Sequence, residues 1–230
     1  MAEHTEPASQ TSGRGLALRR GEIAGLLIVL IAAAAISYAL ASSSSPAKGI
    51  YGSAIATHVR GYEGLAEAKA VPAPSLKLDN YLGRPVNLRS FRGKAVLVTF
   101  IYTHCPDTCP LMVSHLHTAL ALMTPSERAA LQIIAVSVDP RGDTPKTVAA
   151  FLHNHLMTGR MQFLIGSRAQ LQSTWSTWGI SAGSQSATPD VVEHTALIYG
   201  ITDKGKVAVV YPSNFTPGEI AHDARLLAAA

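Results

Sequence analysis

The sequence predicts an α/β domain over residues 71–230, because strand patterns and helix patterns alternate along it. Three near-continuous apolar runs, at 94–102, 131–139 and 161–166, are typical of strands that are buried on both faces of a sheet. A helix pattern follows each run, at 111–123, 145–155 and 168–178 respectively. Crossovers of this kind make part of the sheet parallel.

Two hairpins flank these units. Residues 75–80 and 85–90 alternate apolar and polar side chains around YLGR, which predicts a short N-terminal β-hairpin extension. Near the other end, residues 195–202 and 206–211 read as strands joined by a turn at Asp203-Lys204-Gly205.

Helix boundaries carry their own signals. Thr144 followed by Pro145 begins one helix, and Ser167 caps another that ends at Gly179. The last helix begins with a capping box from Thr216 to Glu219.

The N-terminal region predicts a membrane anchor. Residues 23–41 contain no charged side chain, and the run matches the roughly 20 residues that a helix needs to span a bilayer. Arg14, Arg19 and Arg20 precede it, so the positive-inside rule places residues 1–22 in the cytoplasm as a short tail.

A cleaved signal peptide is the alternative, because Ala39-Leu40-Ala41 resembles a cleavage site. The run exceeds the usual apolar region of about 7–15 residues, which favours a retained transmembrane helix. Residues 42–70 are rich in Ser, Gly and Ala and are expected to be a linker. The domain at 71–230 would then lie on the extracytoplasmic, periplasmic-type side.

Composition excludes some functions. The formal net charge is +4, and the 19 Lys and Arg residues form no basic stripe interleaved with aromatic residues, so nucleic-acid binding is not expected. Two cysteines are too few for a disulfide framework. A local pair of this kind favours chemistry over stabilisation.

The cysteines stand in THCPDTCP, residues 103–110, with three residues between them and a proline after each. Proline disfavours the helical conformation for the residue before it, so Cys105 and Cys109 are expected in a loop, with the helix beginning at Pro110 or Leu111. The N-terminus of a helix favours a thiolate. Because the pair follows the first buried strand, where a thioredoxin-like fold keeps its chemistry, we expect that fold.

The pair could be a disulfide, a redox dithiol or part of a metal site. For a metal site, His194 in DVVEHTALIYG is the candidate third ligand, because it is expected in the polar loop just before the penultimate strand, and in a thioredoxin-like sheet this loop faces the dithiol. His104 is at most a tuning group, and Met112 is expected in the core. The remaining histidines carry no ligand pattern.

Three blocks together, VTFIYTHCPDTCP, IAVSVDPRGDTP and VEHTALIYGITDKGKV, resemble the Sco/SenC family of membrane-anchored copper chaperones. The resemblance covers Val71 to the C-terminus and the anchor. It implies that Cys105, Cys109 and His194 bind copper, and that Asp139 has a supporting role. It further implies delivery to the dinuclear copper site of cytochrome c oxidase subunit II, or to a similar client. Thr108 departs from the family pattern, which more often has an apolar residue there.

The ligand types agree with this reading. Two thiolates and an imidazole suit Cu(I), and imidazole also accommodates Cu(II), although zinc accepts the same set with water. The alternative is a thiol-disulfide oxidoreductase that acts without metal, exchanging electrons with a thiol reductant. A peroxidase of the peroxiredoxin kind is disfavoured, because Thr103 lies only two residues before Cys105. The resemblance implies chiefly a metallochaperone, with thiol-disulfide reductase activity of the same cysteines as the lesser role.

Overall fold

The computed structural model describes residues 55–57, 61–185, 192–194 and 196–230. The predicted cytoplasmic tail at 1–22 and the predicted anchor at 23–41 lie outside these residues. Over the described ranges, no helix is long and apolar enough to cross a bilayer.

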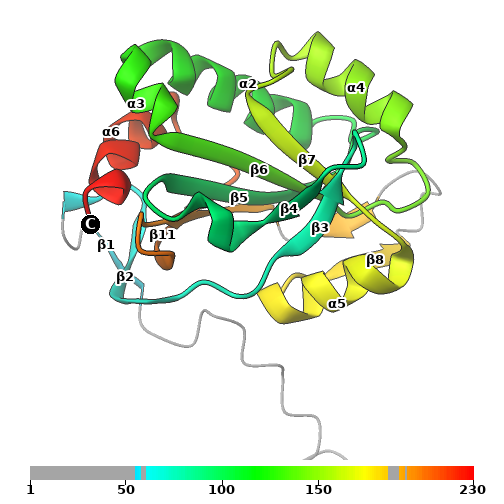
Figure 1. Ribbon diagram of the computed structural model, residues 1–230, viewed down its shortest axis with the longest axis horizontal. Coiled ribbons are helices and arrows are strands. Elements are labelled where there is room, and N and C mark those ends of the chain that lie inside the picture. Colours follow the sequence, from blue (N-terminus) through cyan, green and yellow to red (C-terminus); the bar gives the residue numbers. More distant parts are fainter. Residues whose placement is uncertain (1–54, 58–60, 186–191, 195) are drawn as a thin grey trace, which may run out of the picture. The chain divides into compact units, whose positions relative to one another are not determined.

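A mixed sheet forms the centre of the described domain (Figure 1), with strand order β1-β2-β11-β10-β5-β6-β7-β3-β4. Strands β5, β6 and β7 are parallel, and β10 pairs with β5 in the antiparallel direction. The strands of this sheet are β1 (Ile55–Thr57), β2 (Leu65–Pro72), β3 (Lys77–Asn80), β4 (Pro85–Asn87), β5 (Ala95–Ile101), β6 (Leu131–Ser137), β7 (Met161–Ile165), β10 (Leu197–Ile201) and β11 (Lys206–Pro212).

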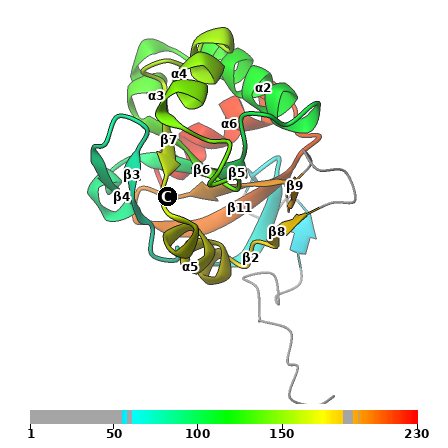
Figure 2. The ribbon, with the colours of Figure 1, turned by 90° about the vertical axis from the view of Figure 1, so that its right-hand side faces the viewer.

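Helices cover both faces of the sheet. Figure 2 shows α2, α3, α4 and α6 on one side of the strands and α5 on the other. The helical segments are η2, a 3-10 turn (Leu88–Phe91), α2 (Thr108–Leu122), α3 (Pro125–Ala129), α4 (Pro145–Asn154), α5 (Arg168–Trp178) and α6 (Pro217–Ala228).

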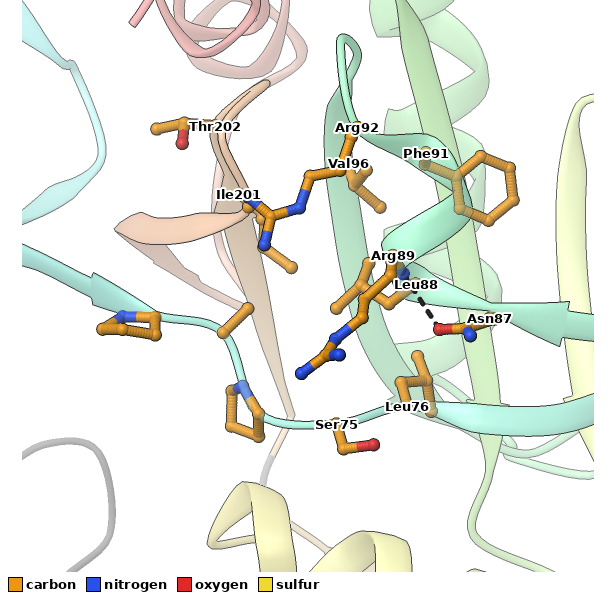
Figure 3. Close-up of a pocket in the computed structure, with 14 residues that line it drawn as sticks. Ser75, Leu76, Asn87, Leu88, Arg89, Phe91, Arg92, Val96, Ile201 and Thr202 are labelled. Atoms are coloured by element: carbon orange, nitrogen blue, oxygen red, sulfur yellow. Dashed lines mark hydrogen bonds between the residues drawn. The ribbon is translucent and has the colours of Figure 1, made fainter.

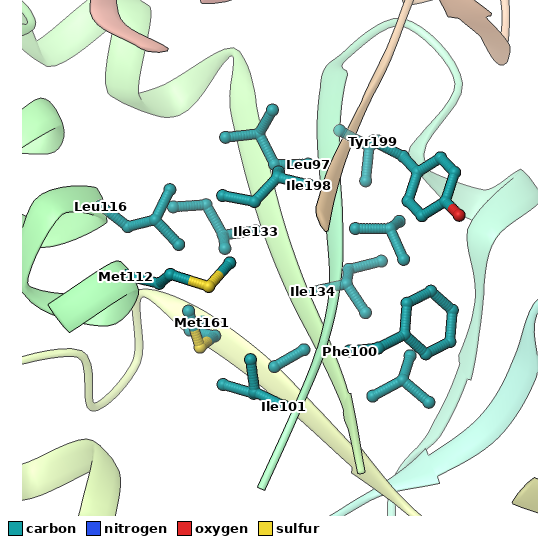
Figure 4. Close-up of a cluster of buried hydrophobic side chains, with 14 of the residues drawn as sticks. Leu97, Phe100, Ile101, Met112, Leu116, Ile133, Ile134, Met161, Ile198 and Tyr199 are labelled. Carbon is teal, nitrogen blue, oxygen red and sulfur yellow. The ribbon is translucent and has the colours of Figure 1, made fainter. Parts of the chain in front are cut away.

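The core has one layer on each face of β5. In Figure 4, Met112 of α2, Ile101 and Ile133 lie on one side of the strands, while Phe100 and Tyr199 lie on the opposite side. All five side chains are almost completely buried. On that opposite side, the ring of Trp178 from α5 packs on Tyr199 with centroids 5.2 Å apart. The alternation along β5 therefore directs successive side chains to the two helical layers.

Most of the expected elements are confirmed. The parallel strands at β5, β6 and β7, both hairpins and the three later helices lie where the patterns placed them. Thr144, Ser167 and Thr216 each form a capping box, and Gly179 ends α5 with a φ of 68°.

Two boundaries differ from expectation. The linker predicted over 42–70 contains β1 and much of β2, which pairs with β11, and Ala66 of β2 is fully buried. The segment contains few large apolar residues, so the sequence indicates a strand there only weakly. Its pairing partner, β11, comes next to it only in the folded sheet. In the region of the predicted polar loop at 181–190, residues Ala182–Gln185 form β8, paired with β9 (Val192–His194).

Candidate metal centre

The cysteine segment connects β5 to α2. Asp107 is the N-cap of α2, and its carboxylate accepts hydrogen bonds from the backbone N–H and the hydroxyl of Thr108. Cys109 is therefore in the first helical turn, and the expectation that both cysteines precede the helix is wrong for Cys109. The reason is that N–H groups of the first turn have no intrahelical acceptor, so Pro110 removes no hydrogen bond there. Cys105 lies outside the helix, as predicted.

The two sulfurs lie together and in different environments. The backbone N–H of Cys109 donates to Sγ of Cys105 at 3.3 Å. Cys109 is fully buried and Cys105 is half-buried, and both are free thiols. Cys105 is thus the sulfur that solvent and partners can reach.

The different hydrogen bonding and burial of Cys105 and Cys109 determine which sulfur carries the negative charge. The pKa of the Cys105 thiol falls to about 5, chiefly because the Cys109 thiol donates a hydrogen bond to it, and backbone N–H groups add to the effect. The pKa of Cys109 is raised, first by that same hydrogen bond and then by burial. Near neutral pH, the pair therefore shares one negative charge, centred on Cys105.

A buried carboxylate positions the cysteine loop. Asp143 accepts hydrogen bonds from the backbone N–H of Thr103 at 2.8 Å, from its hydroxyl at 2.8 Å and from the hydroxyl of Ser137 at 2.6 Å. Burial raises the pKa of Asp143 to about 6, against the lowering effect of these hydrogen bonds. Sequence reasoning missed this residue and chose Asp139, although Asp143 directly precedes the cap of α4 in the same block.

Asp139 and His104 lie beside the same loop. A Cβ on Gly142 would be 2.2 Å from Oδ2 of Asp139 and 3.0 Å from Nδ1 of His104. Any larger residue at position 142 would therefore require the side chains of Asp139 and His104 to move. Nδ1 of His104 is also 3.2 Å from the Thr103 hydroxyl, and its side chain is exposed. This supports a role for both residues in loop conformation.

His194 is the last residue of β9, paired with Ala182 of β8, and its side chain falls outside the description. The topology brings this part of the chain toward the cysteines, because β10 begins at Leu197 and its Ile198 pairs with Thr99 near the end of β5. Among the described residues, no three Cys, His, Asp or Glu side chains form a group that could hold a metal ion. The third ligand therefore stays a prediction.

The other sulfur and imidazole groups near the site are either buried in the core or in contact with backbone carbonyl oxygens. Met112 is fully buried in the core, which confirms the prediction. His115 Nδ1 is 3.1 Å from the carbonyl oxygen of Phe215, and His155 Nδ1 is 2.8 Å from that of Phe151. His155 also lines a surface depression beside Cys105, together with Asn154. The accessible sulfur thus opens onto a surface formed partly by α4.

Comparison with known proteins gives consistent results. The SCO1/SenC family matches residues 66–229. A SCO1 protein homolog of Bacillus subtilis is 31% identical over 134 residues, which are 57% of this chain and 69% of the relative.

Two solved structures share the fold. The copper-bound structure of Bradyrhizobium japonicum ScoI has a TM-score of 0.56 and 28% identity, covering 69% of this chain and 99% of that one. BsSco, a member of the Sco family of cytochrome c oxidase assembly proteins in which a disulfide switch was identified, has a TM-score of 0.58 and 26% identity. That match covers 69% of this chain and 94% of BsSco. These similarities confirm the predicted thioredoxin-like arrangement of the domain, and the chain belongs to the SCO1/SenC family.

Proposed function

We propose that this chain is a copper metallochaperone whose metal site consists of Cys105, Cys109 and His194. The observation that carries the proposal is the pair of adjacent sulfurs at the start of α2, one of which is held as a thiolate. A relative in the same family, Bradyrhizobium japonicum ScoI, has been solved with copper bound.

The donor set fits Cu(I). Thiolate sulfur is a soft ligand that this ion prefers, and an imidazole as third ligand keeps the site open to Cu(II). Cys105 is already deprotonated near neutral pH, whereas Cys109 must lose its proton when the metal binds. Copper binding is therefore expected to release about one proton from the cysteine pair.

Release of the metal requires a ligand that a client can reach. Cys105 is half-buried beside a surface depression, so a client thiolate could replace it stepwise while Cys109 still holds the ion. Since BsSco belongs to a family of cytochrome c oxidase assembly proteins, we assign the dinuclear copper site of subunit II, or a similar site, as the client.

For location, we propose that residues 23–41 are retained as a single transmembrane anchor, with residues 1–22 cytoplasmic and the copper domain extracytoplasmic. The mass of the mature protein from membranes tests this, because cleavage after Ala41 would remove the first 41 residues.

Substitution of His194 tests the metal site. In the full-length reduced protein, His194→Ala should abolish tight Cu(I) binding in competition with a chromophoric chelator, because only two ligands remain. His153→Ala is the matched control, since His153 is an exposed histidine of α4. Equal copper affinity of His194→Ala and the unsubstituted protein would exclude the three-ligand site.

The second candidate is a thiol-disulfide oxidoreductase, favoured by the reactive state of Cys105. Its thiolate would attack a client disulfide, releasing one client thiolate and forming a mixed disulfide. Cys109, deprotonated as it attacks, would then displace the second client thiolate, leaving a Cys105–Cys109 disulfide and a reduced client. His194→Ala should keep this activity, so the same variant separates the two functions.

A further inference from the structure

Two surface depressions lie along the same two helices, α2 and α4, which Figure 2 shows on one side of the sheet. The first contains Cys105, and its lining includes Pro110 of α2 and Asn154 of α4. The second is lined by His117 of α2 and His153 of α4. Pro110 and His117 are two helical turns apart on one face of α2, a distance of about 10 Å. The two depressions together, here called the α2–α4 surface, therefore extend away from the reactive sulfur.

An exposed leucine lies at the far end of this surface. Leu156 lines the second depression, and its side chain is 64% exposed. Its φ of 57° lies in the left-handed region, which favours glycine after the end of a helix. A strained, exposed leucine of this kind is typical of a functional contact. At the concave surface beside Arg89 and Arg92, by contrast, Leu76 and Val96 are buried and cannot contact a partner (Figure 3).

The two helices that border the α2–α4 surface contain no carboxylate. Asp and Glu are absent from residues 108–122, which form α2, and from residues 144–185, which include α4. Two exposed cations lie there instead. Arg160 lines the second depression, and Lys146 precedes by one helical turn Ala150, which lines the first. Within the described part of the chain, neither cation has an ion-pair partner.

Carboxylates lie at the cysteine end of the surface. Oδ1 of Asp107 is 3.9 Å from Sγ of Cys105, and Asp139 lies in the neighbouring loop after β6. An acidic group on a partner is therefore repelled close to Cys105 and attracted near Arg160. About three residues of an extended chain span the roughly 10 Å between the two depressions.

We propose that the α2–α4 surface binds a client segment in which a cysteine is followed by an apolar residue and then by acidic residues. The client sulfur would meet Cys105, the apolar side chain would contact Leu156, and the carboxylates would be attracted by Arg160 and Lys146. This inference rests on the proposed function, in which a client sulfur meets Cys105, and adds the chemistry of the client around that sulfur. Opposite charges of this kind chiefly raise the rate of encounter.

Disulfide exchange with a peptide tests the surface without metal. The peptide is acetyl-Cys-Gly-Leu-Glu-Glu-amide, with its cysteine in a disulfide with 2-thiopyridine. The Cys105 thiolate attacks the peptide sulfur, the original S–S bond breaks, and the departing pyridine-2-thiolate takes up a proton and is followed by its absorbance. With full-length reduced protein in a non-ionic detergent at low salt, this peptide should react roughly tenfold faster than its Gln-Gln analogue. The difference should shrink at high salt.

Substitutions locate the contacts. Arg160→Gln and Lys146→Gln should each slow the Glu-Glu peptide roughly threefold and leave the rate of the Gln-Gln peptide unchanged, which also shows that Cys105 keeps its reactivity. Arg168→Gln is the matched control and should change neither rate, because Arg168 is an exposed residue of α5 on the other side of the sheet. Leu156→Gly, whose φ suits glycine, should slow both peptides by a similar factor, because it removes an apolar contact and no charge.

Equal rates for the two peptides, or an equal loss in Arg168→Gln, would overturn the proposed client surface. Either result with tight copper binding intact would leave the metallochaperone function standing, because no metal takes part in the exchange. Conversely, copper affinity that His194→Ala leaves unchanged would count against the three-ligand site and would not alter the peptide rates.

Discussion

At the scale of single residues, the two cysteines have opposite properties although they share one motif. Cys105 accepts hydrogen bonds at the surface, whereas Cys109 donates from a fully buried position. A thiolate is the reactive form of cysteine, so nucleophilic attack belongs to Cys105. Cys109 is suited to resolve a mixed disulfide or to retain the metal during transfer.

This difference predicts the pH dependence of alkylation. In the reduced, metal-free protein, the rate of Cys105 modification by iodoacetamide should rise with pH through a midpoint near 5, and Cys109 should stay unmodified. Cys109→Ala should move the midpoint to higher pH, because it removes the hydrogen bond that contributes most to the lowered pKa. Mass spectrometry of quenched samples measures both.

Cys105→Ser is the control for the site of modification, and it should show no fast phase. A midpoint near the ordinary thiol value of 9.0 would contradict the described hydrogen bonding.

At the scale of elements, the site depends on a connection between two loops. The loop after β5 carries Cys105, and the loop after β6 carries Asp143, whose carboxylate holds the backbone N–H of Thr103. Neighbouring parallel strands bring these loops to the same edge of the sheet. The position of the cysteine segment is therefore set jointly by both strands.

Asp143 should also make stability depend on pH. Burial raises its pKa from 3.8 to about 6, so ionisation is less favourable in the folded state than in the unfolded state. Its contribution to the free energy of unfolding is fully present below about pH 3.8 and is lost as pH rises through 6. Urea unfolding between pH 4 and 7 measures this. The free energy of unfolding should be higher for the unsubstituted protein than for Asp143→Asn, and the difference should shrink as pH rises.

Cys105 titrates in the same pH range and also contributes to the free energy of unfolding. Because it is present in both proteins, its contribution cancels when the unsubstituted protein is compared with Asp143→Asn. Asp79→Asn, an exposed position in β3, is the matched control and should follow the unsubstituted protein. A difference that grows with pH would contradict the raised pKa of Asp143.

At the scale of the described domain, one buried carboxylate ties the N-terminal strands to the last helix. Asp223 of α6 is fully buried and accepts hydrogen bonds from the backbone N–H groups of Glu63 and Gly64, at 2.9 and 3.0 Å. The Tyr211 hydroxyl donates to it at 2.9 Å, and His222 Nδ1 lies 2.8 Å away. The chain entering β2 is thereby fixed to a residue about 160 positions later.

Asp223→Ala should lower the free energy of unfolding by about 3 kcal/mol, because it leaves the buried N–H of Gly64, the partly buried N–H of Glu63 and the buried Tyr211 hydroxyl without their acceptor. Tyr211→Phe, which removes one hydrogen bond, should cost about 1 kcal/mol. Urea unfolding measures both. Hydrogen exchange should accelerate in β2, at residues 65–72, more than in β6. Unchanged exchange in β2 would show that strand pairing alone fixes this segment.

The sequence identified most of the fold, because its central strands are continuous apolar runs and its helices begin with strong caps such as Thr144 and Ser167. It missed β2, since LAEAKAVP combines small apolar and charged residues in a pattern that also suits a linker. The sequence also predicted that Cys109 lies outside α2, because a following proline disfavours the helical conformation. The structure has Cys109 in the first turn of α2, where a proline removes no hydrogen bond.

By itself, the sequence determined the residue types of the site, its place after a buried strand and the family to which the chain is similar. The tertiary structure decided which sulfur is buried and which carries the charge, since these depend on packing and hydrogen bonds around α2. It also decided that Asp143 holds the loop and that Cys105 and α4 line one depression. Such properties arise between residues distant in sequence, whose burial and partners exist only after folding.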